Sequence, residues 1–433
     1  MIDFIPFKST YLFLFLMLNF QLISCAQSSG LKVKKRNIKK EKSESLKIKT
    51  AADRTNLYLK LLKGKNVAVV ANQTSVISKR FNSESYGIDI PSRQVVEGVT
   101  LSKIKYVHLV DSLLSLNINV KKVFAPEHGF RGKADAAEIV KDGFDTKTGL
   151  KIVSLYGKSK KPSAKELEGI DVLVFDIQDV GVRFYTYISS LHYVMEACAE
   201  AGIKVIVLDR PNPNGHYVDG PVLEMEHTSF VGKHPVPVVY GMTIGEYGKM
   251  INGEKWLKNG IQCDLKVIPL ANYTHNSEYS LTTRPSPNLP NDKSINLYPS
   301  LGFFEGTIIN AGRGTEFQFQ RYGASFFPKN NFSYTPKPNF GSKYPKEKGK
   351  ICYGVDLSNT KKLSAVNLEW LIDAYKKTPK TESFFGNTFT IHAGTKRLQQ
   401  QLEQGLSAKK IRESWKKGLA KFKKVRKRYL IYD

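Results

Sequence analysis

The sequence predicts an α/β protein with a doubly wound parallel sheet and a second, smaller α+β domain. Three observations support this fold class. Four short apolar runs, rich in β-branched residues, have the length of strands that are buried on both faces. Helical patterns lie between these runs, and such alternation is typical of parallel sheets. Each run also ends in a cluster of polar residues.

The expected strands cover residues 67–71, 120–125, 172–175 and 203–208. The carboxyl ends of parallel strands share one edge of a sheet, and ligands bind outside that edge. We therefore expect the polar clusters to converge on one site. The residues that follow the first, third and fourth strands are candidates for binding a ligand: Asn72, Gln73, Thr74, Asp176, Gln178, Asp179, Asp209, Arg210, Asn212 and Asn214.

Two helical patterns separate the strands. Residues 108–116 form the first, between the first and second strands. Residues 185–201 form the second, and Gly202 closes it, because glycine commonly follows the last residue of a helix.

The cluster after the second strand is the most informative, with the run A-P-E-H-G-F-R-G at residues 125–132. A proline and two glycines surround Glu127 and His128, a composition poorly suited to a packed core. Glycine permits tight turns and close approach to a ligand, so the run suits a functional loop. Glu127 is our first candidate for a catalytic acid; the alternative is a glutamate that only caps the next segment.

The N-terminus indicates export. Residues 11–24 are mostly apolar with Lys8 ahead of them, a pattern too short for a confident membrane span. We interpret residues 1–25 as a signal peptide. Its end, L-I-S-C, resembles the bacterial lipoprotein box, which implies that Cys25 is lipidated and that the protein is a membrane-anchored lipoprotein facing the periplasm or the cell exterior. The alternative is an ordinary signal peptide cut nearby.

The length of 433 residues allows a large core and two domains. Residues 26–51 are expected to be a basic, flexible tether, with folded structure from about Ala52. We expect the sheet domain to cover residues 52–220 and the smaller domain to cover residues 221–433, with the site in a cleft between them.

The formal net charge is +27, and two segments carry most of it. Residues 31–50 have a net charge of +7 and residues 409–428 of +10. The second segment predicts a packed helix with a solvated basic face, because apolar residues recur at helical spacing: Ile411, Trp415, Leu419, Phe422 and Val425. We expect no nucleic-acid partner, since no motif for one is present. Attraction to an anionic membrane or wall polymer explains the charge at least as well.

The second half alternates helical patterns with turns. Helices are expected at residues 244–251 and 363–376, and a final strand at 429–432. The prolines of residues 284–291 exclude regular helix and interior strand. A glycine-rich segment then concentrates polar side chains: Glu305, Asn310, Arg313, Thr315 and Glu316. Arginine suits bidentate recognition of a carboxylate ligand; the alternative is an Arg–Glu pair that stabilises the loop.

Cysteine and histidine usage indicates no metal site. No cysteines have zinc-site spacing, and the eight histidines include no close H-x-x-x-H pair. Cys198 lies in a helical pattern and is expected in the core. One Cys263–Cys352 disulfide is compatible with an oxidising compartment.

Six motifs resemble a bacterial family of exo-β-N-acetylmuramidases, long labelled only as a domain of unknown function. They are P-E-H-G-F-R-G (126–132), S-L-Y-G (154–157), F-D-I-Q-D-V-G-V-R-F-Y-T-Y (175–187), D-R-P-N-P-N-G (209–215), G-R-G-T-E (312–316) and R-Y-L-I-Y (428–432). The resemblance runs from about Asn56 to the C-terminus. It implies a Rossmann-like domain joined to a smaller domain, a site between them, and no cofactor.

The implied reaction releases N-acetylmuramic acid from the non-reducing end of peptidoglycan fragments. Such hydrolysis generally needs an acid that protonates the leaving oxygen and a second carboxylate. The resemblance implies Glu127 as the general acid, with His128 tuning or orienting it. The second carboxylate is one of Glu316, Asp176, Asp179 and Glu138, and we favour Glu316 because it would face Glu127 across the expected cleft.

Further residues are candidates for binding the sugar. Arg313, Arg183 and Arg210 suit the lactyl carboxylate of N-acetylmuramic acid. Side chains for hydroxyl and acetamido groups are Asn72, Gln178, Asn212 and Asn214, and Tyr185 or Tyr187 suits packing on the ring.

Three other functions compete. A deacetylase or amidase acting on the same polymer would be favoured by a metal site, against which the histidine spacing counts. A dinucleotide enzyme is disfavoured because N-Q-T-S, not G-x-G-x-x-G, follows the first strand. A non-catalytic lipoprotein that binds wall sugars would keep Arg313 and the aromatic residues but would not need Glu127.

Overall fold

The computed structural model describes residues 47–81, 103–132, 142–157 and 159–433. Cys25, Glu138 and the expected signal peptide lie outside these residues. Residues 1–48 and 49–433 are separate units, and every element below belongs to the second. No helix of the described residues is long and apolar enough to cross a membrane.

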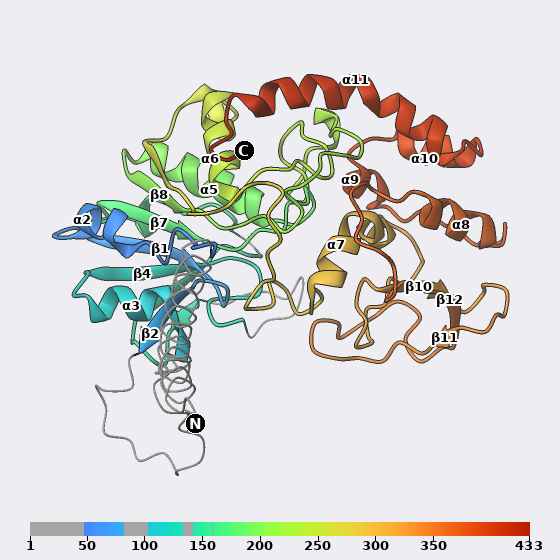
Figure 1. The fold of residues 1–433 in the computed structure, drawn as a ribbon, viewed down its shortest axis with the longest axis horizontal. Helices are drawn as coiled ribbons and strands as arrows, with labels where there is room; N and C mark the ends of the chain where they lie inside the picture. Colours follow the sequence, from blue (N-terminus) through green and yellow to red (C-terminus); the bar gives the residue numbers. More distant parts are fainter. Residues whose placement is uncertain (1–46, 82–102, 133–141, 158) are drawn as a thin grey trace, which may run out of the picture. The chain divides into compact units, whose positions relative to one another are not determined.

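A seven-stranded sheet forms the centre of this unit (Figure 1). Its parallel strands lie in the order β6-β4-β1-β7-β8-β9, which is the 3-2-1-4-5-6 order of the Rossmann fold, and β5 pairs antiparallel with β6 at one edge. The strands are β1 (Val67–Ala71), β4 (Val120–Ala125), β5 (Gly143–Phe144), β6 (Lys151–Ser154), β7 (Val172–Asp176), β8 (Lys204–Leu208) and β9 (Leu265–Ile268). The predicted fold class and all four predicted strands are confirmed.

The sheet is buried on both faces. In β1, Ala68 and Val70 pack into one hydrophobic cluster, whereas Val67, Val69 and Ala71 pack into another. Side chains alternate across a strand, so burial on both faces requires a continuous apolar run, as the sequence has.

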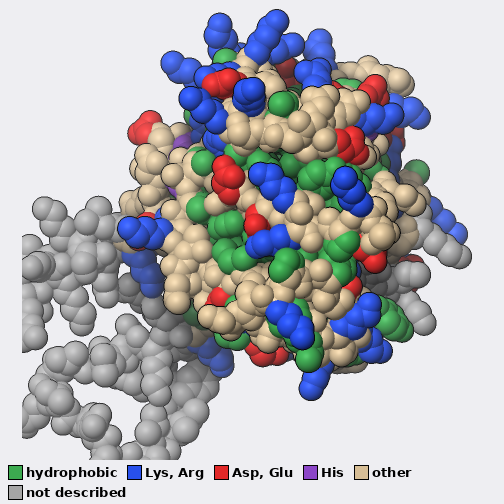
Figure 2. Space-filling view, turned by 90° about the vertical axis from the view of Figure 1, so that its right-hand side faces the viewer, with side chains coloured by type: hydrophobic (Ala, Val, Ile, Leu, Met, Phe, Trp, Pro, Cys, Tyr) green, Lys and Arg blue, Asp and Glu red, His purple; other side chains and the backbone are tan. Residues whose placement is uncertain are grey.

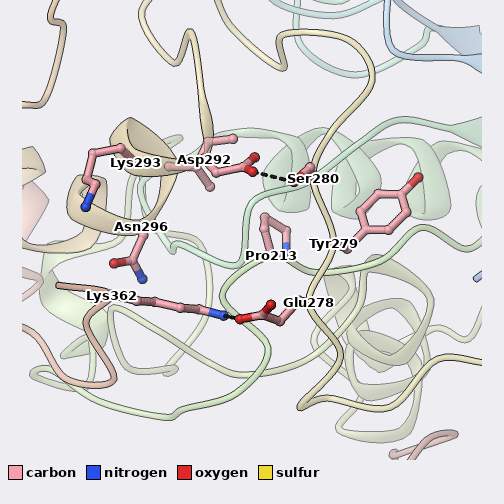
Figure 3. A pocket seen from close by; sticks show the side chains of 9 residues that line it. Pro213, Glu278, Tyr279, Ser280, Asp292, Lys293, Asn296 and Lys362 are labelled. Carbon is pink, nitrogen blue, oxygen red and sulfur yellow. Dashed lines mark hydrogen bonds and ion pairs between the residues drawn. The ribbon is translucent and has the colours of Figure 1, made fainter. Parts of the chain in front are cut away.

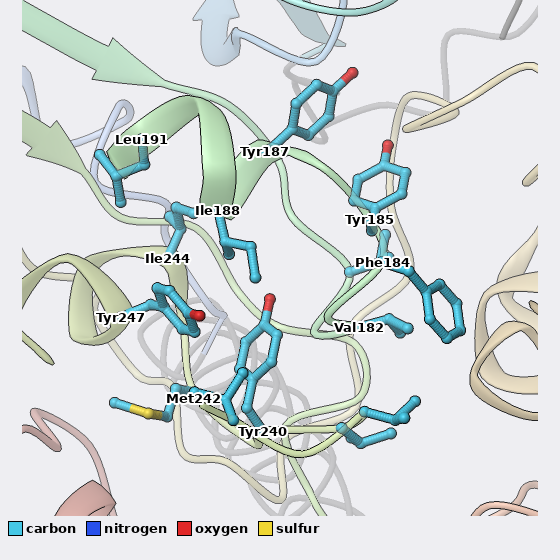
Figure 4. Packing of buried hydrophobic residues seen from close by; sticks show 14 of the residues in the cluster. Val182, Phe184, Tyr185, Tyr187, Ile188, Leu191, Tyr240, Met242, Ile244 and Tyr247 are labelled. Carbon is cyan, nitrogen blue, oxygen red and sulfur yellow. The ribbon is translucent and has the colours of Figure 1, made fainter. Parts of the chain in front are cut away.

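Helices cover both faces. On one face, α5 (Tyr187–Glu200) and α6 (Ile244–Gly253) pack against β8. Figure 4 shows Ile188 and Leu191 of α5 beside Ile244 and Tyr247 of α6. On the other face, α3 (Leu109–Ser115) packs against β4. The helices predicted at 108–116, 185–201 and 244–251 are therefore confirmed, with small shifts at their ends.

The remaining elements of the first half are short. They are η1 (Thr55–Leu57), α2 (Leu59–Leu62), the antiparallel pair β2 (Val76–Phe81) and β3 (Lys103–His108), α4 (Ala164–Leu167), η3 (Met225–His227) and η4 (Lys258–Gly260).

The second half is a smaller α+β assembly. A three-stranded antiparallel sheet has the order β10-β12-β11. The elements are α7 (Asp292–Leu301), η5 (Gly302–Gly306), β10 (Arg321–Ala324), β11 (Ser333–Tyr334), β12 (Cys352–Asp356), α8 (Glu369–Lys377), α9 (Phe389–Ala393), α10 (Arg397–Glu403) and α11 (Ala408–Lys427). Phe303, Phe389 and Trp415 share one hydrophobic cluster with α5, so a continuous core joins the two halves.

Two expected boundaries differ from the structure. The parallel sheet extends past residue 220, because α6 packs on it and β9 is its last strand. Backbone hydrogen bonds to the folded part also begin before Ala52, at residues that we expected to belong to the tether. Lys49 and Ala271 exchange two backbone hydrogen bonds of 3.0 Å, and the Ala51 N–H donates to the Asp209 carbonyl at 3.1 Å.

Two predicted elements are wrong in part or in full. Helix α8 starts at Glu369 rather than near residue 363, because the Leu363 and Val366 N–H groups donate to Asn296 and Asp219 side chains at 2.7 Å. Residues 429–432 are not a strand. The Ile431 N–H instead donates to Glu246 Oε1 at 2.8 Å, so a carboxylate takes the place of a neighbouring strand.

The C-terminal helix and the proline-rich turns are confirmed. Ile411, Trp415 and Phe422 are buried on the inner side of α11, and residues 284–291 contain no helix or strand. Cys198, Cys263 and Cys352 are all buried and unbonded, so the Cys263–Cys352 disulfide does not form.

Candidate active site

Glu127 lies in a tight turn at the carboxyl end of β4. The Gly129 N–H donates to the Pro126 carbonyl at 3.0 Å and closes the turn. His128 has a φ of 71°, a left-handed conformation that such turns usually reserve for glycine. Backbone conformations of this kind cost about 1–3 kcal/mol and cluster at functional sites. The turn leaves Glu127 half-buried, whereas His128 is buried beneath it.

The N-terminus of α5 faces Glu127. Thr186 is the N-cap residue of α5, but its hydroxyl does not bond the helix backbone; it donates to Glu127 Oε2 at 2.9 Å. The Tyr187 hydroxyl reaches the Glu127 carbonyl at 3.3 Å. The positive end of a helix dipole attracts a carboxylate. Burial, together with the Glu127 charge and hydrogen bond, raises the pKa of Tyr156, which places this phenol beside the same carboxylate.

The glycine-rich segment presents an arginine. Gly312 and Gly314 have φ values of 79° and 81°, and a Cβ at Gly312 would lie 2.4 Å from the Phe317 carbonyl oxygen. Glycines are therefore required on both sides of Arg313. Its Nη1 donates to Glu305 Oε2 at 2.6 Å and its Nη2 to the Gly341 carbonyl at 3.2 Å. The buried Nε–H has no hydrogen-bond partner among the described residues.

This arginine lines a small cavity. Its volume is about 100 Å³, and Glu305, Asn310, Tyr344 and Lys346 contribute to the wall with Arg313. Lys346 Nζ donates to the Phe304 carbonyl at 2.6 Å and to the Glu305 carbonyl at 3.1 Å, which holds it at the end of η5.

Electrostatics connects this cavity to Glu127. The Glu305 carboxylate raises the pKa of Arg313 against the effect of burial, and Glu127 raises it further. Tyr298 of α7 is influenced by both groups: burial raises its pKa, the Glu305 and Glu127 charges add to the rise, and Arg313 opposes it. The charges of the turn after β4 and of the glycine-rich segment are therefore within electrostatic range of each other.

Asp176 and Arg210, two predicted site residues, neutralise each other instead. Arg210 Nε and Nη2 donate to the two Asp176 oxygens at 2.6 and 2.8 Å, and both side chains are almost completely buried. Burial opposes the Arg210 charge, but the Asp176 carboxylate holds the pKa of Arg210 above its usual value. The pair supports the end of the sheet and does not face the site.

Two other predicted carboxylates are also buried. Asp179 accepts hydrogen bonds from the Gly181 N–H and the Tyr240 hydroxyl, and burial raises its pKa to about 6. Asp209 accepts from the Gly245 N–H at the start of α6 at 2.8 Å, and burial raises its pKa to about 7.

The predicted asparagines and Arg183 have structural partners. Asn212 and Asn214 donate to the Met242 and Val180 carbonyls at 2.8 and 2.9 Å. Arg183, fully buried, donates to four carbonyls, those of Pro221, Val236, His392 and Ala393, at 2.7–3.0 Å. Burial lowers the pKa of Arg183 to about 9. All three side chains are buried and bonded within the fold.

The ends of β1 and β7 are bonded to each other. The Ser75 hydroxyl donates to the Asp176 carbonyl, and the Gln178 N–H donates to Thr74 Oγ1 at 3.0 Å. Asn72 is fully buried, and its Nδ2 donates to the Tyr187 hydroxyl at 2.8 Å. Asn72 thus supports Tyr187, which contacts the Glu127 backbone. Gln178 uses its amide nitrogen on the Asp179 and Pro211 carbonyls at 2.7 Å.

Of the remaining candidates, Thr315 and Tyr185 make structural hydrogen bonds and Glu316 is exposed to solvent. Thr315 donates to the Gly312 carbonyl at 2.7 Å and fixes the loop. The Tyr185 hydroxyl donates to the Pro285 carbonyl at 2.6 Å; Figure 4 shows Tyr185 and Tyr187 pointing away from the Tyr240–Tyr247 cluster. Glu316 is exposed.

Sequence reasoning missed Thr186, Tyr298 and the role of Glu305. Thr186 reads as an ordinary helix cap, and Tyr298 as a core residue of α7. The sequence places Glu305 in the polar glycine-rich segment but does not show that it pairs with Arg313. Tyr156 lies in the S-L-Y-G motif, whose residues alone do not indicate a role for it.

A second cavity, of about 220 Å³, contains none of the predicted site residues (Figure 3). Lys362 reaches Glu278 at 3.3 Å across it, and Ser280 donates to Asp292. Both charges of the Lys362–Glu278 pair are well exposed, so the pair contributes little.

Among the described residues, one group has side chains close enough to hold a metal: Glu224, Glu226 and His227. Thr395 and Arg397 already bind the Glu224 carboxylate, at 2.8 and 3.1 Å. A cation would have to compete with the arginine.

Two family models cover most of the chain. The N-terminal model of exo-beta-N-acetylmuramidase NamZ matches residues 95–293, and the C-terminal model matches residues 296–432. The peptidoglycan beta-N-acetylmuramidase NamZ of Bacillus subtilis (strain 168) is 34% identical over 451 residues, which cover 98% of this chain and 100% of that protein.

Two crystal structures of DUF1343 family proteins from Bacteroides fragilis NCTC 9343 have the same fold. The one at 1.30 Å resolution is 42% identical with a TM-score of 0.77, over 89% of this chain and 99% of that chain. The one at 1.65 Å resolution is 27% identical with a TM-score of 0.74, over 90% of this chain and 100% of that chain.

Proposed function

Because this chain belongs to the exo-β-N-acetylmuramidase NamZ family, we propose that it is a glycoside hydrolase that releases N-acetylmuramic acid from the non-reducing ends of peptidoglycan fragments, with Glu127 as the general acid. One observation supports Glu127. Of the predicted carboxylates that the structure describes, Asp176 and Asp179 are buried among structural partners and Glu316 is exposed. Glu127 alone is half-buried at a strand end, with its carboxyl held by Thr186.

The geometry holds the Glu127 carboxyl group in one orientation. Thr186 fixes one carboxyl oxygen, and Tyr156 and the end of α5 surround the group, so its orientation is set before substrate arrives. A general acid so positioned contributes about 10²–10⁴-fold in rate.

Arg313 is proposed to bind the lactyl carboxylate. Its unpartnered buried Nε–H is an available donor, and Glu305 holds the guanidinium in place. Charge-assisted hydrogen bonds of this kind are the strong ones in carboxylate recognition. We propose Glu305, rather than Glu316, as the carboxylate that acts opposite Glu127, because Glu305 lines the cavity beside Arg313.

The test uses residues 26–433 and a disaccharide of N-acetylmuramic acid β-linked to N-acetylglucosamine, with the muramic acid non-reducing. Mass spectrometry follows the released monosaccharide. We expect Glu127→Gln to lower turnover at least 100-fold. Glu316→Gln is the matched control and should change turnover less than twofold.

Two outcomes would contradict the proposal. Turnover by Glu127→Gln close to the wild-type value would remove Glu127 from the reaction. Binding of the disaccharide without turnover by the wild type would favour the wall-sugar-binding lipoprotein.

We also propose that the protein is exported and anchored through a lipid on Cys25. The apolar residues 11–24 and the L-I-S-C sequence support this. Mass spectrometry of the mature N-terminus in a bacterial host should find a lipidated Cys25, and Cys25→Ser should move the protein from the membrane fraction to the soluble fraction. An unmodified N-terminus elsewhere in the wild type would overturn the proposal.

A further inference from the structure

The outer face of α11 carries lysines that pair with no carboxylate of the described residues. Arg412 pairs with Asp219 at 2.8 Å and Arg428 with Glu254 at 2.7 Å. The exposed lysines have no ion-pair partner within the part of the chain that the structure describes; they are Lys409, Lys410, Lys416, Lys417, Lys421, Lys423, Lys424 and Lys427. We name this set the α11 lysine face. Glu413 is the one acidic residue of the helix.

Helix geometry places these lysines on one side. At 100° per residue they fall within an arc of about 160°, centred opposite the buried Ile411, Trp415 and Phe422. The 20 residues of α11 make this face about 30 Å long. Figure 1 shows α11 along the outside of the molecule, and Figure 2 shows Lys and Arg side chains gathered at the same height. Since the apolar residues pack inward, the face attracts by charge alone.

The lysine face ends at a basic hollow. The hollow has a volume of about 540 Å³, and its wall includes Lys423, Arg426, Lys427 and His275. Asp433 is the acidic residue of this wall, and its carbonyl accepts a hydrogen bond from the His275 N–H at 2.8 Å. A phosphate group would meet several positive side chains there.

The expected tether joins the fold beside this end of α11. Lys49, the first residue of the folded unit, pairs with Ala271. The adjacent Leu270 N–H donates to the Tyr432 hydroxyl at 2.8 Å, five residues beyond the end of α11. Lys49, near the end of the basic segment 31–50, therefore lies close to the residues that follow α11.

We propose that the α11 lysine face and its hollow form an electrostatic docking surface for a membrane rich in anionic phospholipid. Clusters of basic residues recognise such membranes, and each lysine near the surface contributes about fivefold in binding. The lysine face has no exposed aromatic residue on which a base or a sugar ring would stack, which disfavours nucleic acid and glycan strands.

The experiment measures co-sedimentation of residues 26–433 with vesicles of phosphatidylcholine alone or with phosphatidylglycerol added. The test variant combines Lys416→Gln, Lys423→Gln, Lys424→Gln and Lys427→Gln. The matched control removes the same charge from exposed lysines elsewhere: Lys63→Gln, Lys65→Gln, Lys121→Gln and Lys165→Gln. Both variants keep the whole tether. Turnover of the soluble disaccharide checks that each is folded, and no exchanged lysine belongs to the active site.

We expect wild type and control to bind the anionic vesicles, to ignore phosphatidylcholine, and to dissociate in high salt. The test variant should bind at least tenfold more weakly with turnover unchanged. If both variants bound the anionic vesicles equally weakly, the loss would come from net charge alone, and the proposal would be overturned. Absence of vesicle binding, or α11-dependent binding to peptidoglycan sacculi or nucleic acid in its place, would also overturn it.

Discussion

Replacing Asp176 by asparagine tests whether the Asp176–Arg210 pair supports the fold or belongs to the active site. In the wild type, Arg210 makes two charge-assisted hydrogen bonds to Asp176, at 2.6 and 2.8 Å. Asparagine keeps one acceptor, so one bond is lost and the guanidinium stays buried without an opposite charge. Breaking one side of a buried pair costs about 3–5 kcal/mol. We expect Asp176→Asn to lower the free energy of unfolding by that amount.

The assay is urea unfolding at pH 7, read from the midpoint at an unchanged slope. Asp264→Asn is the matched control, because Asp264 pairs with Lys204 at the other end of β8 and both side chains are about half exposed or more. Asp264→Asn should lower the free energy of unfolding by less than about 1 kcal/mol. A double variant, Asp176→Leu with Arg210→Met, should recover much of the loss, since both buried charges are then gone.

Turnover distinguishes the two roles. At a temperature where Asp176→Asn is fully folded, its rate of N-acetylmuramic acid release should stay within about threefold of wild type. Unchanged stability together with a loss of turnover comparable to that of Glu127→Gln would refute the structural role and return Asp176 to the active site.

Three further predictions address the site and the fold. Arg313→Lys should weaken binding of free N-acetylmuramic acid by about 1.5–3 kcal/mol and leave N-acetylglucosamine binding unchanged in calorimetry, because the lactyl carboxylate that Arg313 is proposed to bind is absent from N-acetylglucosamine; equal weakening would contradict this role. Burial raises the pKa of Asp179 from 3.8 to about 6, so the folded state binds the proton of Asp179 more tightly than the unfolded state does. The contribution of this group to the free energy of unfolding is therefore largest below pH 4 and is lost as the pH rises through 6. The free energy of unfolding of the wild type relative to Asp179→Asn should therefore fall by about 2 kcal/mol between pH 4 and pH 7 in urea unfolding, whereas a constant difference would contradict the shift. Trp415→Ala should cost about 3–5 kcal/mol in the same assay, and a cost below 1 kcal/mol would show that α11 is not anchored through this ring.

The sheet could be predicted because its signal is local. Burial on both faces requires a continuous apolar run, and Val67–Ala71 reads as one without any knowledge of its partners. The segment after α11 could not be predicted in this way. Tyr429–Tyr432 has the composition of a strand, but its hydrogen-bond partner is the carboxylate of Glu246, some 185 residues earlier.

In the active site, too, only the residues marked by their immediate neighbours in the sequence could be predicted. Glu127 could be identified because proline and glycines mark its turn, a property of adjacent residues. Asp176 and Arg210 have the residue types of a catalytic site, and only the fold shows that they neutralise each other across 34 positions. Thr186 was missed because a threonine at a helix start usually caps its own helix.

The hydrogen bonds between the ends of β1 and β7 limit where the protein could evolve a site for a different ligand. In this strand order the gap beside the first strand is the customary ligand position, because the chain reverses direction there. Here the side chains of Ser75 and Thr74 join the two loops across that gap. A new ligand would first have to break those bonds, beside Asn72, which supports Tyr187. Relatives with other sugar preferences should therefore vary around the turn after β4 and the loop that carries Arg313, and keep the β1–β7 junction unchanged.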